Sequence, residues 1–458
     1  MIRAVDPLAD VREAIAAALA RPASSLPLAM LCHPGSRVTV VCADPNYDPE
    51  GLDEILLPAL LGELKAAGVH DEDITILSAT GLRPHSSNAE RYVQFGDSVV
   101  GRYLILNHDP HDVRENDDLG MVGSVPVSVN YHAVEADLLI ATGVVRPHVY
   151  AGYTGGSAVV AEGCAGTATI NELYSPRFLD DPSVLAGNVS ENACQRAIRE
   201  IGKRAGLAFV LNAVVDSAGH VVAVAAGAPN AVHDRLVEFA RNAYEVEAPR
   251  ESYNVIIAPA SEPGRDLYCA SCDSAFIAMP RNGVLVKGGV LVLGLGEPAA
   301  NGAGGHSADR RRFFDILTDA TDMDSILRQL RRQGIREGEH CAYTLARAVV
   351  EKGYRIIMVG GDSAVMTSRS GLIAARTMAE AAELAEAFVG SRPYALVMPP
   401  GRRLMPSYMG VKPFARAPID DPSGIEDTRW AVRQLRADLD LERDFDSLLP
   451  ESGLYSEN

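Results

Sequence analysis

RVTVVCA at residues 37–43 and ITILSA at residues 74–79 indicate the class of fold. Both runs are short, apolar and rich in β-branched residues, which is typical of buried strands. Residues 51–68 between them have the apolar spacing of a helix. A strand, a helix and a second strand in this order form a βαβ unit with parallel strands. We therefore predict an α/β fold with mainly parallel sheets.

The same alternation continues along the chain in two series. The first has expected strands at residues 103–106, 136–141, 208–215 and 220–224, and a helix at 230–244. After the polar residues 246–252, the second has expected strands at 254–258, 289–295, 355–359 and 395–398, and helices at 313–318, 344–352 and 378–389. We predict an N-terminal α/β domain at residues 1–250 and a C-terminal α/β domain at residues 251–458 with a helical tail. A cleft is expected between them.

Composition and charge exclude several functional classes. The 458 residues are 47% hydrophobic and 22% charged, which is typical of a folded protein. Lys and Arg number 42 and Asp and Glu number 60, so the net charge is −18. Such a polyanion has no electrostatic reason to bind nucleic acid or an anionic membrane, whereas a local pocket can still bind a small anion. The sequence does not indicate the oligomeric state.

Targeting features and cysteine usage favour the cytoplasm. Residues 1–22 form an acidic amphipathic pattern without the cationic and apolar regions of a signal peptide. No apolar run reaches the ~18 residues that a membrane span needs. The seven cysteines are odd in number and scattered, so we expect reduced thiols.

Candidate site residues follow three of the predicted strands, because ligands of open α/β sheets bind beyond the carboxyl ends of the strands. Asp44 follows the first strand, and Arg83 and His85 follow the second. In the third segment, 146–157, His148 is a candidate base. The backbone after it is predicted to bind an anion through Gly152, Thr154, Gly155, Gly156 and Ser157. Ordinary turn chemistry accounts for the same residue types, so the pattern alone does not decide.

Two further clusters also have alternative interpretations. Cys269 and Cys272 lie near the expected start of a helix at residue 266. They are either ordinary buried thiols or a reactive or metal-binding pair at the cleft. Residues 107–112 contain two histidines and two carboxylates, which form either a polar turn or part of a site. His306 and residues 361–363 follow strands of the second domain and are open to the same two interpretations.

The chain resembles a known family over most of its length. Residues 126–170 contain EADLLI (135–140), PH (147–148) and AGYTGG (151–156), and this run is similar to the core motif of the nickel-dependent lactate racemase family. Further family landmarks precede this run at residues 79–81 and 107–109 and follow it at residues 187–188, 212–227 and 368–400, in the same order as in the family. The resemblance therefore includes both predicted domains, and it implies that residues 1–250 are the catalytic and cofactor domain.

This resemblance implies a racemase or epimerase of a small anionic 2-hydroxy acid. In the family, a nickel-pincer derivative of a pyridinium mononucleotide takes a hydride from C2 and returns it to either face, while histidines exchange the hydroxyl proton. Asp44 matches the family's strand-end aspartate, and His148 matches one of its two catalytic histidines. Proton-exchanging and cofactor-binding roles at these positions are thus what the resemblance implies.

Other positions depart from the family pattern. Arg83 occupies the place of the second catalytic histidine, with His85 two residues further on. Ala158 replaces the lysine that tethers the cofactor, and Tyr174 replaces a nickel-binding histidine. Alanine has no amine for the link, and a phenol is a poor ligand at a soft nickel–sulfur centre. We expect a nickel-pincer type nucleotide that is held non-covalently. The sequence does not decide whether nickel itself is bound. The alternative is a protein that retains the cleft for binding or for different chemistry.

Overall fold

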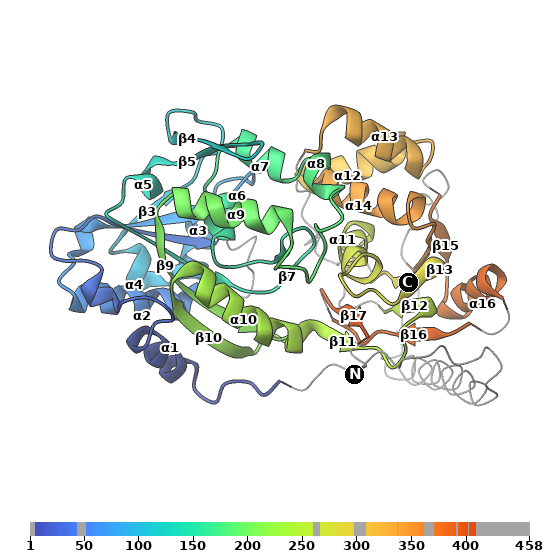
Figure 1. The fold of residues 1–458 in the computed structure, drawn as a ribbon, viewed down its shortest axis with the longest axis horizontal. Helices are drawn as coiled ribbons and strands as arrows, with labels where there is room; N and C mark the ends of the chain where they lie inside the picture. The colour runs from blue at the N-terminus through green and yellow to red at the C-terminus, as the bar shows by residue number, and fades with distance from the viewer. Residues whose placement is uncertain are drawn as a thin grey trace, which may run out of the picture.

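The computed structural model describes residues 5–43, 52–259, 266–296, 308–336, 338–360, 371–390, 393–401 and 403–408. Within them the chain forms one sheet of six strands and one of five, which lie side by side with their helices (Figure 1). This confirms the predicted α/β fold with mainly parallel sheets. The six-stranded sheet ends at Gly227 in the chain and the five-stranded sheet begins at Tyr253. The domain boundary near residue 250 stays a prediction.

The six-stranded sheet has the order β10-β9-β6-β1-β2-β3. Its strands are β1 (Val38–Ala43), β2 (Ile74–Ala79), β3 (Leu104–Asn107), β6 (Leu138–Val144), β9 (Leu207–Val215) and β10 (Val221–Gly227). Neighbouring strands are parallel except for the antiparallel pair β9 and β10. β1 and β2 pair residue by residue, from Val38 with Ile74 to Ala43 with Ala79.

Helices cover both faces of this sheet, and for this reason its strands are apolar throughout rather than alternating. All six residues of β1 are buried. Val40 and Cys42 belong to an apolar cluster on one face, whereas Val41 belongs to a cluster on the other. The helices are α1 (Val11–Ala20) and α2 (Asp53–Ala66) on the first face and α6 (Ala158–Gly163), α9 (Ala193–Arg204) and α10 (Pro229–Tyr244) on the second.

The five-stranded sheet is entirely parallel, in the order β15-β14-β13-β12-β16. Its strands are β12 (Tyr253–Ala258), β13 (Leu285–Gly294), β14 (Arg355–Val359), β15 (Ile373–Ala375) and β16 (Ala395–Val397). One face packs on α16 (Met378–Val389), and the other on α11 (Leu267–Ala278) and α14 (Glu339–Val350). Ile256 of β12 and Val210 of β9 belong to the same buried cluster, so apolar packing is continuous between the two sheets.

Several elements were not predicted from the sequence. The antiparallel hairpin of β4 (Asn116–Val122) and β5 (Val125–Asn130) is one, and the parallel pair of β11 (Glu245–Glu247) and β17 (Met405–Ser407) is another. The others are η1 (Leu28–Met30), η2 (Asp71–Asp73), α3 (Asn88–Phe95), α4 (Asp97–Val100), α5 (Tyr131–Val134), β7 (Pro147–His148), β8 (Gly152–Tyr153), α7 (Thr167–Leu173), α8 (Pro176–Leu179) and α13 (Met323–Gln333). The helix predicted at residues 313–318 lies within α12 (Ala308–Asp319). In the described ranges, no helix has the length and apolar character to cross a membrane.

The strand order reverses once in each sheet, between β1 and β6 and between β12 and β16. In open parallel sheets, ligands bind beyond the carboxyl ends of the strands at such a point. The ends of β1 and β6, together with α11, which follows β12, border one common cavity. The topology therefore predicts a ligand site in this cavity, between the two sheets.

Candidate active site

A cavity of about 350 Å³ lies beyond the carboxyl ends of β1, β2 and β6. We call one side of it the loop wall, which consists of the cavity-lining residues between Ala43 and Tyr174. The opposite side, the helix wall, consists of the cavity-lining residues between Tyr268 and His340, together with Arg403. Residues far apart in the sequence therefore surround the same space.

His148 lies on the loop wall, in β7, which pairs with β8 across a tight turn. Its Nδ1 accepts the backbone N–H of Ala151 at 3.0 Å and that of Tyr150 at 3.4 Å. A neutral imidazole has one bare nitrogen, so these bonds assign Nδ1 as the bare one and Nε2 as the N–H. Burial is the main cause that lowers the pKa of His148 from 6.5 to about 3, and the nearby Arg403, His340 and Arg146 act in the same direction. His148 is therefore neutral at pH 7 and has a hydrogen-bond donor left at Nε2.

The glycines after His148 are required by close packing. A Cβ on Gly152 would lie 2.0 Å from the backbone oxygen of Asn188, and φ there is +81°. A Cβ on Gly155 would lie 2.5 Å from Cγ2 of Val145, with φ at +89°. Neither position has room for a side chain, so these residues determine the shape of the loop wall.

The predicted anion-binding backbone is partly engaged within the protein. The amide of Thr154 donates to the carbonyl of Arg146 at 2.8 Å, and that of Gly156 donates to Oδ1 of Asn212 at 2.9 Å. Two of the amides expected to bind an anion are thus already bonded. Among the residues that the structure describes, Thr154 and Gly155 line the cavity, whereas Gly152, Gly156 and Ser157 do not.

The other residues proposed from the sequence have different positions. Arg83 lines the cavity, at the end of a turn in which its amide donates to Thr80 O at 3.1 Å. His85 is exposed and is not part of the cavity lining as described. Asp44, His306 and residues 361–363 lie outside the described residues.

The cluster at residues 107–112 forms a structural turn. Nε2 of the buried His108 lies 2.9 Å from the carbonyl of Ala165, and its Nδ1 lies 3.3 Å from Nδ2 of Asn130. Nδ1 of His111 lies 3.0 Å from Oγ1 of Thr167. Throughout the described residues, no group of three or more His, Cys, Asp or Glu is arranged to hold a metal ion.

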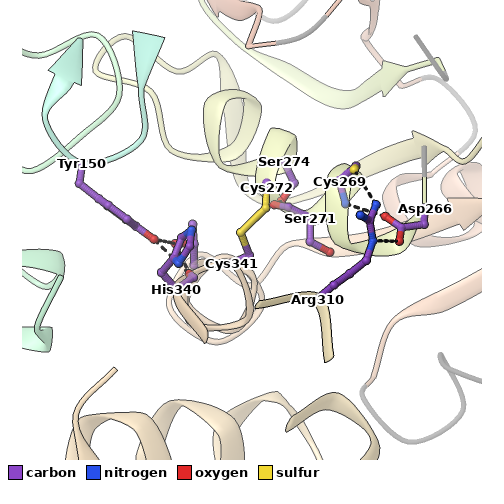
Figure 2. The surroundings of a disulfide bond; sticks show 10 residues. Tyr150, Asp266, Cys269, Ser271, Cys272, Ser274, Arg310, His340 and Cys341 are labelled. Atoms are coloured by element: carbon purple, nitrogen blue, oxygen red, sulfur yellow. Dashed lines mark hydrogen bonds and ion pairs between the residues drawn. A yellow bond between two sulfur atoms is a disulfide. The ribbon is translucent and has the colours of Figure 1, made fainter. Parts of the chain in front are cut away.

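His340 is a second cavity histidine, and sequence reasoning missed it. It lies in the first turn of α14, where its backbone carbonyl accepts a hydrogen bond from the hydroxyl of Tyr150 at 3.1 Å (Figure 2). Burial, and then the charge of Arg83, lowers the pKa of His340 from 6.5 to about 4. His340 is therefore neutral at pH 7. No local motif could have indicated it, because its neighbours in the site come from the other half of the chain.

Glu162 adds an acid to the loop wall. It lines the cavity at the end of α6, and burial raises its pKa from 4.5 to about 8, while a hydrogen bond with Tyr174 opposes the rise. Its carboxyl group is therefore largely protonated at pH 7. A protonated carboxyl group can donate a proton or a hydrogen bond to a bound ligand.

Arginines give the cavity a positive lining on a chain whose net charge is −18. Arg83 and Arg146 belong to the loop wall, and Arg336 and Arg403 belong to the helix wall. Arg146 is only 2% exposed although it carries a full charge. Guanidinium groups bind carboxylates through paired hydrogen bonds, so the lining suits a small organic anion.

The expectation that all cysteines are reduced is wrong for one pair. Cys272 of α11 and Cys341 of α14 form a disulfide with Cα atoms 5.1 Å apart (Figure 2). The pairing was not foreseen because the two residues are 69 positions apart and become neighbours only when α11 packs against α14. The compartment stays a prediction, and reduced thiols no longer support it.

Cys269, the other cysteine of the CxxC pair, does not have the features of a reactive thiol. It lies near the start of α11, whose N-cap is Asp266, and it contacts the guanidinium of Arg310 at 3.3 Å. Burial, and then the charge of Asp266, raises the pKa of this thiol above 9.0. A helix N-terminus would lower a thiol pKa, but burial dominates at this position.

The residues present do not fit a covalently tethered nickel cofactor of the kind that the resemblance implies. Ala158, at the tether position, lines the cavity as the first residue of α6 and is 4% exposed. Its methyl group cannot form the link. Tyr174, at the position of a nickel-binding histidine, is hydrogen-bonded to Glu162.

Comparison with known proteins identifies relatives of this chain. Residues 2–185 match the family model described as the lactate racemase N-terminal domain. The lactate racemase of Thermoanaerobacterium thermosaccharolyticum is 27% identical over 355 residues, which are 76% of this chain and 79% of that protein. The lactate racemase of Lactiplantibacillus plantarum is 26% identical over 400 residues, which are 85% and 89% of the two chains. The resemblance expected from the sequence is confirmed.

Solved structures confirm the fold. The lactate racemase apoprotein of T. thermosaccharolyticum superimposes with a TM-score of 0.75 at 24% identity and covers 86% of this chain and 92% of its own. A protein from Thermotoga maritima superimposes with a TM-score of 0.62 at 16% identity and covers 89% of this chain and 100% of its own. The arrangement of the two sheets is thus found in other proteins.

Proposed function

Because the chain is a divergent relative of the lactate racemases, we propose that it is an isomerase that inverts C2 of a small 2-hydroxy acid. One observation carries the proposal: the cavity combines a positive lining with the neutral histidines His148 and His340. A 2-hydroxy acid has a carboxylate that arginines can bind and a neighbouring hydroxyl group that histidines can contact. The chemistry of the cavity therefore matches both functional groups of the substrate.

We assign the following roles to the chain's own residues. Arg83 and Arg146 on the loop wall bind the carboxylate. His148 donates its Nε2–H to the substrate's hydroxyl oxygen, because Nδ1 is occupied by backbone amides. Glu162, protonated at pH 7, is a further proton donor on the same wall. The role proposed from the sequence for His85 is not assigned to it, because this residue is exposed.

Inversion also requires a group that receives the hydrogen of C2 and returns it. In the family that group is the nickel-pincer cofactor. We assign no step to it, because Ala158 cannot tether it and Tyr174 is engaged with Glu162. A nucleotide held without a covalent bond stays a proposal from the sequence, and intact-mass analysis with a metal determination on the purified protein tests it.

The test of the function is inversion of single enantiomers. Full-length protein is incubated with each enantiomer of a panel of small 2-hydroxy acids, and the products are separated by chiral chromatography. We expect inversion of at least one acid. A C2-deuterated substrate distinguishes internal return of the hydrogen, which retains the label, from exchange with solvent, which loses it. Absence of turnover across the panel would contradict the proposal, whether or not the acids bind.

A second candidate function is binding without turnover. It is favoured by Ala158 and Tyr174, which occupy the tethering and nickel-binding positions of the family and cannot perform those roles. A protein of this kind would bind 2-hydroxy acids at the arginine-lined cavity but leave each enantiomer unchanged. Calorimetry beside the inversion assay separates the two candidates.

A further inference from the structure

We propose that His340 accepts the hydrogen bond that the substrate's hydroxyl group donates, while His148 donates to the oxygen of the same group. This inference rests on the proposed function for its substrate class. It assigns unequal roles to two histidines of one cavity, and it places the hydroxyl-proton acceptor on the helix wall. No bond is broken in this step, so it holds for a binding protein as well as for an isomerase.

The first argument is that His148 is committed as a donor. Its bare nitrogen, Nδ1, accepts the amides of Ala151 and Tyr150 at 3.0 and 3.4 Å. A ligand in the cavity can therefore meet only its Nε2–H. Protonation at Nδ1 would displace both amides. His148 can stabilise a hydroxyl oxygen, but it has no lone pair left to accept the hydroxyl proton.

The second argument is that the ring of His340 remains open. Among the described residues, no hydrogen bond to either ring nitrogen of His340 is formed, although its backbone carbonyl is held by Tyr150 and by the hydroxyl of Thr344 at 2.9 Å. The neighbouring Cys341 is joined to Cys272 by the disulfide (Figure 2). The backbone of His340 is thus fixed from two sides while its imidazole still has a bare nitrogen for a ligand.

The third argument is that the two histidines flank the same pair of aromatic rings. The centroid of the His148 ring lies 5.9 Å from that of Tyr150 and 6.4 Å from that of Tyr174. The centroid of the His340 ring lies 6.0 and 5.8 Å from the same two rings. Both histidines therefore border the same corner of the cavity, and the proposal places the substrate's hydroxyl group there.

The charges around this corner support the assignment. Arg83 lowers the pKa of His340, and Arg146 and Arg403 lower that of His148, in both cases after burial. Both rings are therefore neutral before a ligand binds, and a neutral ring is what an acceptor requires. A bound carboxylate offsets the arginine charges and makes both histidines more basic.

The test is a cycle between two ligands and two variants, measured by calorimetry on the full-length protein. Each enantiomer of lactate is compared with 2-fluoropropionate, in which fluorine replaces the hydroxyl group and has no proton to donate. We expect the wild type to bind lactate about tenfold more tightly than its fluoro analogue, from one hydrogen bond. His340→Leu should bind both ligands about equally, whereas His148→Leu should keep the preference while binding both more weakly. His70→Leu, an exposed histidine at the amino end of β2, is the matched control and should behave as the wild type.

A spectroscopic measurement gives a readout that a merely structural role would not move. In protein labelled with ¹⁵N-histidine, lactate should shift the resonance of the bare ring nitrogen of His340, and 2-fluoropropionate should not. An unchanged lactate preference in His340→Leu, with lactate still bound, would overturn this inference and leave the proposed function intact. Failure of lactate to bind at all would overturn both.

Discussion

The two walls of the cavity are built in different ways. The loop wall is shaped by backbone: Gly152 has no room for a Cβ, and two amides orient His148. The helix wall is shaped by side chains of α11 and α14, which the Cys272–Cys341 disulfide joins. The hydroxyl of Tyr150 connects the walls through the carbonyl of His340. A local sequence motif can therefore encode the first wall, whereas the second exists only after distant segments have packed.

The largest effect should come from the hydrogen-bonding group of the loop wall. His148→Ala removes the Nε2–H donor, and we expect turnover of the inverted acid to fall roughly 10²–10³-fold, as for a lost hydrogen-bond donor to a reacting oxygen. The measurement is kcat/KM from the inversion assay, with a thermal melt to show that the variant is folded. Equal rates for variant and wild type would show that His148 does not contribute to turnover and that the loop wall only shapes the cavity.

The next effect tests whether the loop wall is determined by backbone. Gly152→Ala places a Cβ 2.0 Å from Asn188 O at a φ of +81°, and we expect a loss of about 3 kcal/mol or more in unfolding free energy. Gly206→Ala is the matched control, because its φ is +84° but no atom lies within 4 Å of the added Cβ. It should lose only about 1–2 kcal/mol. Similar losses in denaturant titrations would show that strain alone, and not packing, makes Gly152 necessary.

The stability of the helix wall should depend on redox conditions, because a disulfide joins its two helices. Replacing both Cys272 and Cys341 with Ser removes a bridge across 69 residues, and we expect about 2–4 kcal/mol less stability. A reductant should destabilise the wild type and leave the double variant unchanged. If the wild type melts identically with and without reductant, the helix wall is held by packing alone.

A smaller effect should come from the bond between the walls. Tyr150→Phe removes the hydroxyl that donates to the carbonyl of His340, and we expect about 1 kcal/mol less stability, typical of one hydrogen bond. Binding of the 2-hydroxy acid should weaken in parallel, because His340 loses one of its two anchors. Tyr92→Phe changes a hydroxyl on an exposed residue of α3 and should have no effect on binding. Unchanged binding by Tyr150→Phe would show that the walls are positioned independently.

The last prediction concerns the dependence of stability on pH in the acid range. The pKa values of His148 and His340 are lowered to about 3 and about 4 from 6.5, so between these values the unfolded chain binds more protons than the folded one. The two histidines should therefore make stability fall as pH drops from 6.5 towards 4. Denaturant titrations at pH 7 and pH 5 measure the slope, and His340→Asn should reduce it. An equal slope in this variant would mean that His340 is solvated.

Much of the fold followed from the sequence, because apolar periodicity is a local property. The runs predicted at 37–43, 74–79, 136–141, 254–258 and 355–359 each overlap a strand, with starts that differ by at most two residues. Most residues of these strands are buried on both faces, so the runs are apolar without any information from distant segments. The β4–β5 hairpin was missed because β4 has no buried residue and begins with polar residues, Asn116 and Asp117. Its pairing depends on neighbours rather than on its own pattern.

Short runs of the sequence were enough to predict the α/β fold, the resemblance to the lactate racemase family and the position of His148 in a glycine-rich turn. These features depend on short runs whose residue types are dictated by nearby backbone. Three features became visible only in the folded protein: Nδ1 of His148 is occupied, His340 lines the same cavity, and Cys272 is bonded to Cys341. Each of these depends on the distance between atoms after folding. Such distances cannot be inferred from a local pattern, because they are established only when the turn has formed and the helices have packed against the sheets.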